Sequence, residues 1–102
     1  MTKLFRAVGK DEIEDIKNYR IFRTVPLKTL EAKQFTFNLK DANYFGKELF
    51  NGLENQPFQV IEVEIPNELL DKYDIMSLDG RNCVSIDEEL LEEFNKFVII
   101  NI

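Results

Sequence analysis

The segment Phe58–Ile65 alternates apolar and polar side chains and therefore predicts a half-buried β-strand. Isoleucine and valine side chains occupy one face of that strand, whereas Glu62 and Glu64 share the other face. A strand of this kind is stable only when other strands pair with it and another layer covers its apolar face. The chain is therefore expected to fold around a β-sheet.

Short apolar runs next to turn residues predict the other strands, and apolar side chains at helical spacing predict the helices. Strands are expected at residues 4–8, 19–24, 33–37, 83–86 and 98–102. Helices are expected at residues 11–18, at residues 39–50, after Pro66, and after a Ser85–Glu88 capping box as far as Phe97. Asp79-Gly80 is expected to form a turn.

The helix at residues 39–50 is expected to begin at an Asn38 cap and to end at Asn51-Gly52. Its apolar stripe predicts that Phe45 is a core residue that packs on the sheet. The stripe consists of Leu39, Ala42, Phe45 and Leu49.

Strands and helices alternate along the chain, but the strands are short and irregular. This pattern favours an α+β fold over a regular doubly wound sheet. A length of 102 residues is that of one domain and suffices to bury one core. We therefore expect residues 1–102 to form a single globular domain, with a mixed or antiparallel sheet of short strands and three to four short helices.

The chain has no histidine and a single cysteine. It can therefore form neither an imidazole-based catalytic couple nor a zinc site of His and Cys ligands, and no metal is expected. A lone cysteine cannot form an intrachain disulfide, which fits a reducing cytoplasm. No apolar run approaches the roughly 20 residues that cross a bilayer, and the polar start is unlike a signal peptide. A cytoplasmic protein that does not enter membranes is expected.

The formal net charge is −6, from 13 basic and 19 acidic residues. Phosphate backbones repel a negative surface, so the charge predicts no non-specific nucleic-acid binding and suits a basic protein partner. The acidic runs at residues 11–15 and 87–93 each lie at a predicted helix start, where the helix dipole favours carboxylates. They are therefore interpreted as helix starts and not as metal ligands.

Arg6 and Thr36 are residues for which a functional role competes with a structural one. Arg6 interrupts the apolar strand at residues 4–8, where a guanidinium needs a carboxylate or phosphate within hydrogen-bond reach. The alternative is an edge-facing arginine paired with a surface carboxylate. Thr36 lies between Phe35 and Phe37 on the polar face of its strand, where an ordinary strand residue is the alternative to a ligand contact.

Three short motifs occur in the order of a known family. They are LFRAV at residues 4–8, KQFTFN at residues 33–38 and DANYFG at residues 41–46, with a predicted helix between the first two. Together with the tail at residues 79–95, this order resembles small bacterial and phage proteins of the ADP-ribosyltransferase-like fold. The similarity is to the branch with an arginine on the first strand, because the other branch needs a histidine there.

The resemblance implies that NAD is bound as a substrate and that ADP-ribose is transferred to a macromolecule. Arg6 would hold a phosphate or ribose of NAD. Thr36 would stand at the middle of the family's Ser-Thr-Ser element, with Phe35 and Phe37 in place of the two serines. Glu64, in the Glu-x-Glu match at residues 62–64, would be the catalytic acid that stabilises an oxocarbenium-like centre.

The family usually carries its catalytic glutamate one strand later, where residues 82–86 contain none. Either Glu64 acts in an unusual order or the catalytic acid is missing. The sequence therefore leaves open whether the chain is an enzyme. It also leaves open whether Glu64 borders the Arg6 site or is solvated on the sheet surface.

A hypothesis of a different class is a non-catalytic acidic binding protein. An immunity protein, an antitoxin-like inhibitor or an anti-defence factor of a mobile element would block a basic surface of a toxin or nuclease. The small size, the charge of −6 and the absence of histidine suit this hypothesis. The two hypotheses differ in whether Arg6 and a glutamate meet in an open pocket.

Overall fold

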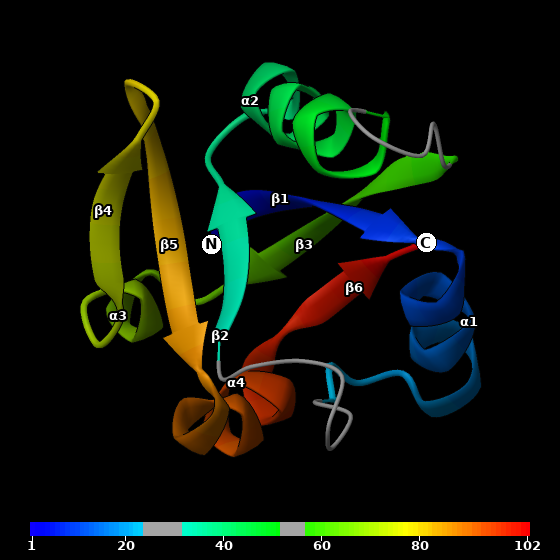
Figure 1. The fold of residues 1–102 in the computed structure, drawn as a ribbon. Coiled ribbons are helices and arrows are strands. Elements are labelled where there is room, and N and C mark those ends of the chain that lie inside the picture. The colour runs from blue at the N-terminus through cyan, green and yellow to red at the C-terminus, as the bar shows by residue number, and fades with distance from the viewer. Residues whose placement is uncertain (24–31, 52–56) are drawn as a thin grey trace.

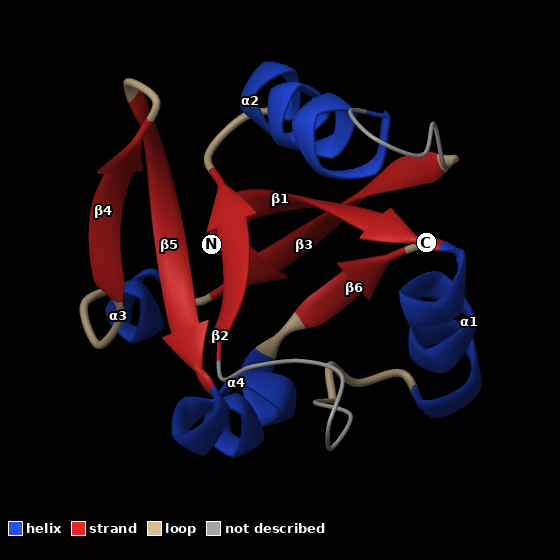
Figure 2. Cartoon of the chain, viewed as in Figure 1, coloured by secondary structure: helices blue, strands red, loops and turns tan. Residues whose placement is uncertain are grey.

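Six strands and four α-helices make up the part of the chain that the computed structural model describes, residues 1–23, 32–51 and 57–102 (Figures 1 and 2). The strands are β1 (Thr2–Gly9), β2 (Ala32–Thr36), β3 (Phe58–Ile65), β4 (Asp74–Leu78), β5 (Arg81–Asp87) and β6 (Ile99–Asn101). The helices are α1 (Lys10–Tyr19), α2 (Leu39–Gly46), α3 (Asn67–Leu70) and α4 (Leu91–Phe97). A π-helical turn, η1 (Lys47–Asn51), follows α2, and a 3₁₀ turn, η2 (Glu88–Leu90), precedes α4. The expected α+β class is confirmed.

All six strands belong to one antiparallel sheet with the order β4-β5-β2-β1-β3-β6. β1 pairs with β3 along its whole length. β1 and β2, by contrast, share a single register pair, Phe5 opposite Thr36. The sheet is therefore divided into two halves, β4-β5-β2 and β1-β3-β6, whose strands run at a wide angle to each other in Figure 1.

One face of the sheet carries the hydrophobic core, which α1, α3 and α4 cover. Three aromatic rings meet within it: Phe22 packs edge-on against Phe35, with centroids 5.3 Å apart, and against Phe94, with centroids 5.7 Å apart. The buried residues of the core are Leu4, Val8, Ile13, Ile16, Phe22, Phe35, Ile61, Val63, Ile65, Leu69, Tyr73, Val84, Ile86, Leu91 and Phe94.

Helix α2 packs on the other face of the sheet, and Gly46 sets how closely it approaches. A Cβ atom added at Gly46 would lie 2.2 Å from the ring of Phe58 on β3, so a larger residue would push the helix away from the sheet. Phe50, at the end of η1, stacks on the same ring with centroids 5.8 Å apart. The face of α2 and η1 that meets the sheet is therefore the line through Ala42, Gly46 and Phe50.

The predicted stripe of this helix is only partly right. Ala42 is buried as expected, but Leu39 and Leu49 are 52% and 75% exposed. The prediction that Phe45 is a core residue is wrong, because Phe45 is half-buried and packs against the ring of its neighbour Tyr44. The glycine shifts the contact line, since its missing side chain leaves room for the Phe58 ring.

Several local signals are confirmed in the structure. The side-chain oxygen of Asn38 accepts a hydrogen bond from the backbone N–H of Asp41 at 2.8 Å, as expected for the N-cap of α2. Asp79 and Gly80 adopt positive φ angles of 51° and 74° and form the predicted turn, a two-residue hairpin between β4 and β5.

Other sequence-based predictions are wrong for identifiable reasons. The described part of residues 19–24 is not a strand, because α1 continues to Tyr19 and ends at Arg20 in the left-handed conformation, with φ 60°. Ser85 does not cap a helix, because it lies inside β5 in register with β2. The sequence pattern does not predict β4, since four of its five residues are exposed and its two faces do not differ in burial.

Candidate functional site

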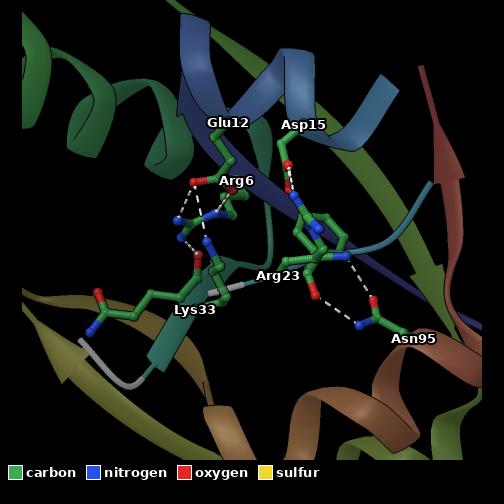
Figure 3. Close-up of polar contacts among 8 residues, drawn as sticks. Arg6, Glu12, Asp15, Arg23, Lys33 and Asn95 are labelled. Atoms are coloured by element: carbon green, nitrogen blue, oxygen red, sulfur yellow. Dashed lines mark hydrogen bonds and ion pairs between the residues drawn. The ribbon is translucent and has the colours of Figure 1, made fainter. Parts of the chain in front are cut away.

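Arg6 lies on the core face of β1 between Leu4 and Val8, which are both 0% exposed. Its side chain is 18% exposed and makes a bidentate contact with the carboxylate of Glu12 in the first turn of α1 (Figure 3). Nε donates to Oε2 at 2.7 Å, and Nη2 donates to Oε1 at 2.9 Å. Nη1 donates to the backbone carbonyl of Gln34 on β2 at 2.9 Å. The prediction that this guanidinium has a partner within hydrogen-bond reach is confirmed.

Lys33 lies beside this pair on β2 and is 4% exposed. Its Nζ is 3.5 Å from Oε1 of Glu12, so one carboxylate serves two cations (Figure 3). We call Arg6, Glu12 and Lys33 the charged cluster. Its formal charge is +2 − 1 = +1, which is a local positive excess in a chain whose net charge is −6.

The surroundings of the cluster change the proton affinities of Glu12 and Lys33. Burial by itself would raise the pKa of Glu12, but the hydrogen bonds and charges of Arg6 and Lys33 outweigh burial and hold that pKa below its ordinary value of 4.5. Burial lowers the pKa of Lys33 below its ordinary value of 10.5; the charge of Glu12 opposes this effect, and the charge of Arg6 adds to it. Lys33 is therefore a buried cation whose charge Glu12 compensates only in part.

A second arginine–carboxylate pair lies one turn further along α1 (Figure 3). Nε of Arg23 donates to Oδ2 of Asp15 at 3.1 Å, and the guanidinium lies over the ring of Tyr19, 3.8 Å from its centroid. Asn95 of α4 holds the adjoining backbone: the N–H of Phe22 donates to its Oδ1, and its Nδ2 donates to the carbonyl of Phe22, both at 2.8 Å. The Arg23 side chain is 41% exposed, so this pair is more open to water than the charged cluster.

No contact between Arg6 and Thr36 or Phe37 is found among the described residues. Thr36 shares the face of Phe5, which is opposite to the face of Arg6. Its hydroxyl donates to the carbonyl of Asn38 at 2.8 Å and so joins the end of β2 to the start of α2. Phe37 is half-buried and packs against the edge of the core. Thr36 thus has a structural partner for its hydroxyl in the protein itself.

Glu64 also lies on the face opposite to Arg6. On β3 it is paired with Lys3, whereas Arg6 is paired with Ile61, and these two positions have opposite side-chain directions. Its Oε2 accepts a hydrogen bond from Nδ2 of Asn101 on β6 at 3.3 Å. The structure therefore does not bring Glu64 to Arg6; the carboxylate beside Arg6 is Glu12.

Two open hollows lie near the candidate residues. One, of about 430 Å³, borders Glu12 and is lined by Gly9, Lys10, Asp11, Glu12, Phe50 and Pro57. The other, of about 470 Å³, borders Phe37 and is lined by Phe37, Asn38, Lys40, Asp41, Gly80, Arg81 and Asn82. Both have the size of ordinary ligand sites. The first hollow is lined by one member of the charged cluster, Glu12, and not by Arg6 or Lys33.

Sequence reasoning did not identify Glu12 and Lys33 as site residues. Lys33 has the same parity on β2 as Phe35, so the apolar face of the predicted strand already contained a lysine. Glu12 was hidden in an acidic run for which the helix start was a sufficient explanation. The contact between the two joins a residue of α1 to a residue of β2 that is 21 positions later in the chain, so no local pattern contains it.

Comparison with protein-family models, with curated proteins and with solved structures finds no match to this chain. Within the described ranges, no group of three or more His, Cys, Asp or Glu side chains is arranged to hold a metal ion. No helix in these ranges is long and apolar enough to span a membrane.

Proposed function

We propose that this chain is an ADP-ribosyltransferase-like protein that binds NAD through the charged cluster. The observation that carries the proposal is the positive excess at Arg6 and Lys33, two cations that share the single carboxylate of Glu12. A pyrophosphate supplies the negative charge that such a cluster lacks, and a guanidinium fork matches the geometry of phosphate oxygens.

The order of the elements supports the same proposal. An arginine on the first strand, a helix, a second strand with Thr36 and a further helix follow one another as in the resembling family. Arg6 also reaches across to β2 where the two halves of the sheet separate, through its bond to the Gln34 carbonyl. A ligand that contacts Arg6 is thereby placed beside both halves.

We propose binding of NAD before its cleavage, because Glu64, the carboxylate expected to be catalytic, does not lie beside Arg6. Cleavage of the nicotinamide–ribose bond needs a negative charge near the ribose to stabilise the oxocarbenium-like centre. Glu64 lies on the opposite face from Arg6, whereas Glu12 contacts Arg6 directly. If the protein cleaves NAD at the charged cluster, Glu12 is the carboxylate within reach.

Titration calorimetry with NAD tests the binding proposal. Lys33→Met removes a cation from the cluster and is expected to weaken NAD binding by about tenfold or more. Arg23→Gln is the matched control, because it also removes one positive charge beside α1 but outside the cluster; it should bind NAD as the wild type does. Absence of NAD binding by the wild-type protein, or equal weakening by both variants, would contradict the proposal.

Release of nicotinamide, measured by chromatography in the presence of candidate acceptor proteins, tests the catalytic step. We expect Glu12→Gln to lower any cleavage by about a hundredfold and Glu64→Gln to leave it unchanged. Loss of cleavage in Glu64→Gln alone would place the reaction on the other face of the sheet and contradict a site at Arg6. The Glu12→Gln protein must be shown to be folded by circular dichroism before its activity is compared.

A second candidate function is the acidic binding protein that blocks a basic surface. The observation that favours it is the exposed acidic segment from the end of β5 through η2 to the first turn of α4, where Asp87, Glu89 and Glu92 all face solvent. We propose a basic toxin or nuclease as its target. The test is inhibition of such an enzyme by the wild type, compared with a triple variant Asp87→Asn, Glu89→Gln, Glu92→Gln. Equal inhibition by both proteins would exclude this segment.

A further inference from the structure

The outer edge of β4 is an unprotected strand edge. β4 ends the sheet, and no strand in the described ranges pairs with its outer side. Ile75 and Met76, which point to opposite faces, are 55% and 37% exposed. Natural edge strands are usually protected from pairing by a lysine, a proline or a bulge, and β4 contains no lysine and no proline. Asp74 is its one charged side chain.

The hairpin determines which backbone groups of β4 are free to pair. Leu78 and Arg81 flank the two-residue turn and therefore exchange both hydrogen bonds of their pair. Hydrogen-bonded and non-hydrogen-bonded pairs alternate along an antiparallel ladder, so Asp74 and Met76 also direct their backbone groups to β5. The N–H and C=O groups of Ile75 and Ser77 therefore point away from the sheet.

We propose that β4 pairs with β4 of a second copy of this chain, antiparallel and about a twofold axis at Met76. Ile75 and Ser77 lie on either side of Met76, so a twofold axis at Met76 places the outward backbone groups of each residue opposite those of the other residue in the second chain. Ile75 of one chain then exchanges both hydrogen bonds with Ser77 of the other, and all four outward groups of each strand are used. The two sheets become one continuous antiparallel sheet.

The distribution of charge makes the β4 edge more suitable for contact with a second copy than the other surfaces of the chain. Two chains that each carry −6 repel each other, so self-association needs a surface with few carboxylates. In the proposed register Asp74 lies opposite Leu78 of the other chain, so the two aspartates do not face each other. The other edge is less suitable, because β6 has three residues and its Asn101 lies against Glu62 and Glu64.

The strength of self-association is expected to be low. A contact between two five-residue strands is smaller than the interface of a stable complex, so dimers should form between about 10 µM and 1 mM. Sedimentation equilibrium over this range measures the dissociation constant directly. Dimerisation of the wild type in this range is expected, and a protein that remains monomeric throughout would overturn the proposal.

A pair of matched variants locates the contact. Ile75→Lys and Ile99→Lys each replace a half-exposed isoleucine on an edge strand by lysine, one at each end of the sheet. The first is expected to weaken dimerisation by about tenfold or more and the second to leave it unchanged. The reverse result would move the interface to β6. Ser77→Pro, which removes an outward N–H without touching the bonds to β5, should act like Ile75→Lys.

Cross-linking tests the register. Met76 faces itself across the axis as a non-hydrogen-bonded pair, with Cα atoms about 4.5 Å apart, which suits a disulfide. Met76→Cys in a Cys83→Ala background should form a covalent dimer on oxidation, since Cys83 otherwise competes from β5. Leu78→Cys in the same background should not, because it lies opposite Asp74. Equal cross-linking of both would show that the proposed register is wrong.

Discussion

Lys33 and Phe35 are two residues apart on β2, point to the same face of the sheet and are 4% and 0% exposed. Phe35 belongs to the aromatic core, where its ring packs against Phe22 and Phe94. Lys33 belongs to the charged cluster, where Glu12 serves both it and Arg6. Two neighbouring positions on one face of β2 therefore have opposite surroundings, since Phe35 packs among aromatic rings and Lys33 lies among charged groups.

Equal burial has opposite energetic consequences at these two positions. Burial of the Phe35 ring removes apolar surface from water and stabilises the fold. Burial of the Lys33 ammonium removes water from a charge, and the lowered pKa of Lys33 records that its surroundings compensate for this only in part. A residue that destabilises the fold where it lies is a candidate for function.

Phe35→Ala should destabilise the protein most. It leaves a cavity among Phe22, Phe94 and the buried strands, and we expect the free energy of unfolding to fall by about 3–5 kcal/mol. Urea denaturation followed by circular dichroism measures the change. A loss below about 1 kcal/mol would mean that the aromatic core tolerates a cavity and that burial of Phe35 stabilises the fold little.

Glu12→Gln should have the next largest effect, because it leaves Arg6 and Lys33 without their shared negative charge. The cluster is half-buried, so we expect a loss of about 1–3 kcal/mol in the free energy of unfolding. Glu14→Gln is the matched control, since Glu14 is an exposed residue of the same helix. Equal losses in the two variants would show that helix charge and not the cluster is responsible.

The same carboxylate predicts a dependence of stability on acid pH. The pKa of Glu12 is lower in the folded protein than its ordinary value of 4.5, so its contribution is fully present above pH 4.5. It is lost as the pH falls through the lowered folded value, because the unfolded chain binds the proton first. The difference in unfolding free energy between the wild type and Glu12→Gln should therefore shrink below pH 4.5. A difference that stays constant there would contradict the lowered pKa.

Lys33→Met should change stability little or increase it, although the residue it replaces is almost completely buried. The variant keeps a long side chain and removes the unfavourable burial of the ammonium. We expect its thermal midpoint to equal or exceed that of the wild type while NAD binding is weakened. A loss comparable to that of Phe35→Ala would show that Lys33 is a structural residue.

Arg23→Gln should have the smallest effect. Its guanidinium is paired with Asp15 but open to solvent, where ion pairs contribute little to stability. No measurable change in the thermal midpoint is expected at moderate ionic strength. A clear loss would show that the pair around Arg23 holds α1 in place as the charged cluster does.

Local chemistry determined a good part of this protein. The alternation in Phe58–Ile65 correctly predicts both ends of β3 and the face of it that is buried, because side-chain direction in a strand has a period of two. Asn38 predicts the start of α2, and an arginine within an apolar strand predicts a partner for its guanidinium. Each of these signals acts between residues that are close along the chain or follows from a single side chain.

The other features of the protein depend on contacts between residues that are distant along the chain, so no local pattern predicts them. The approach of α2 to the Phe58 ring, and not the helical spacing alone, places Gly46 instead of Phe45 on the buried line that begins at Ala42. The register of β1 against β3 places Glu64 on the face away from Arg6. The position of α1 directly after β1 brings Glu12 within reach of Arg6 on β1 and of Lys33 on β2, and so creates the charged cluster. Patterns within a segment specify which side chains share a face, but only the packing of whole elements determines which faces meet.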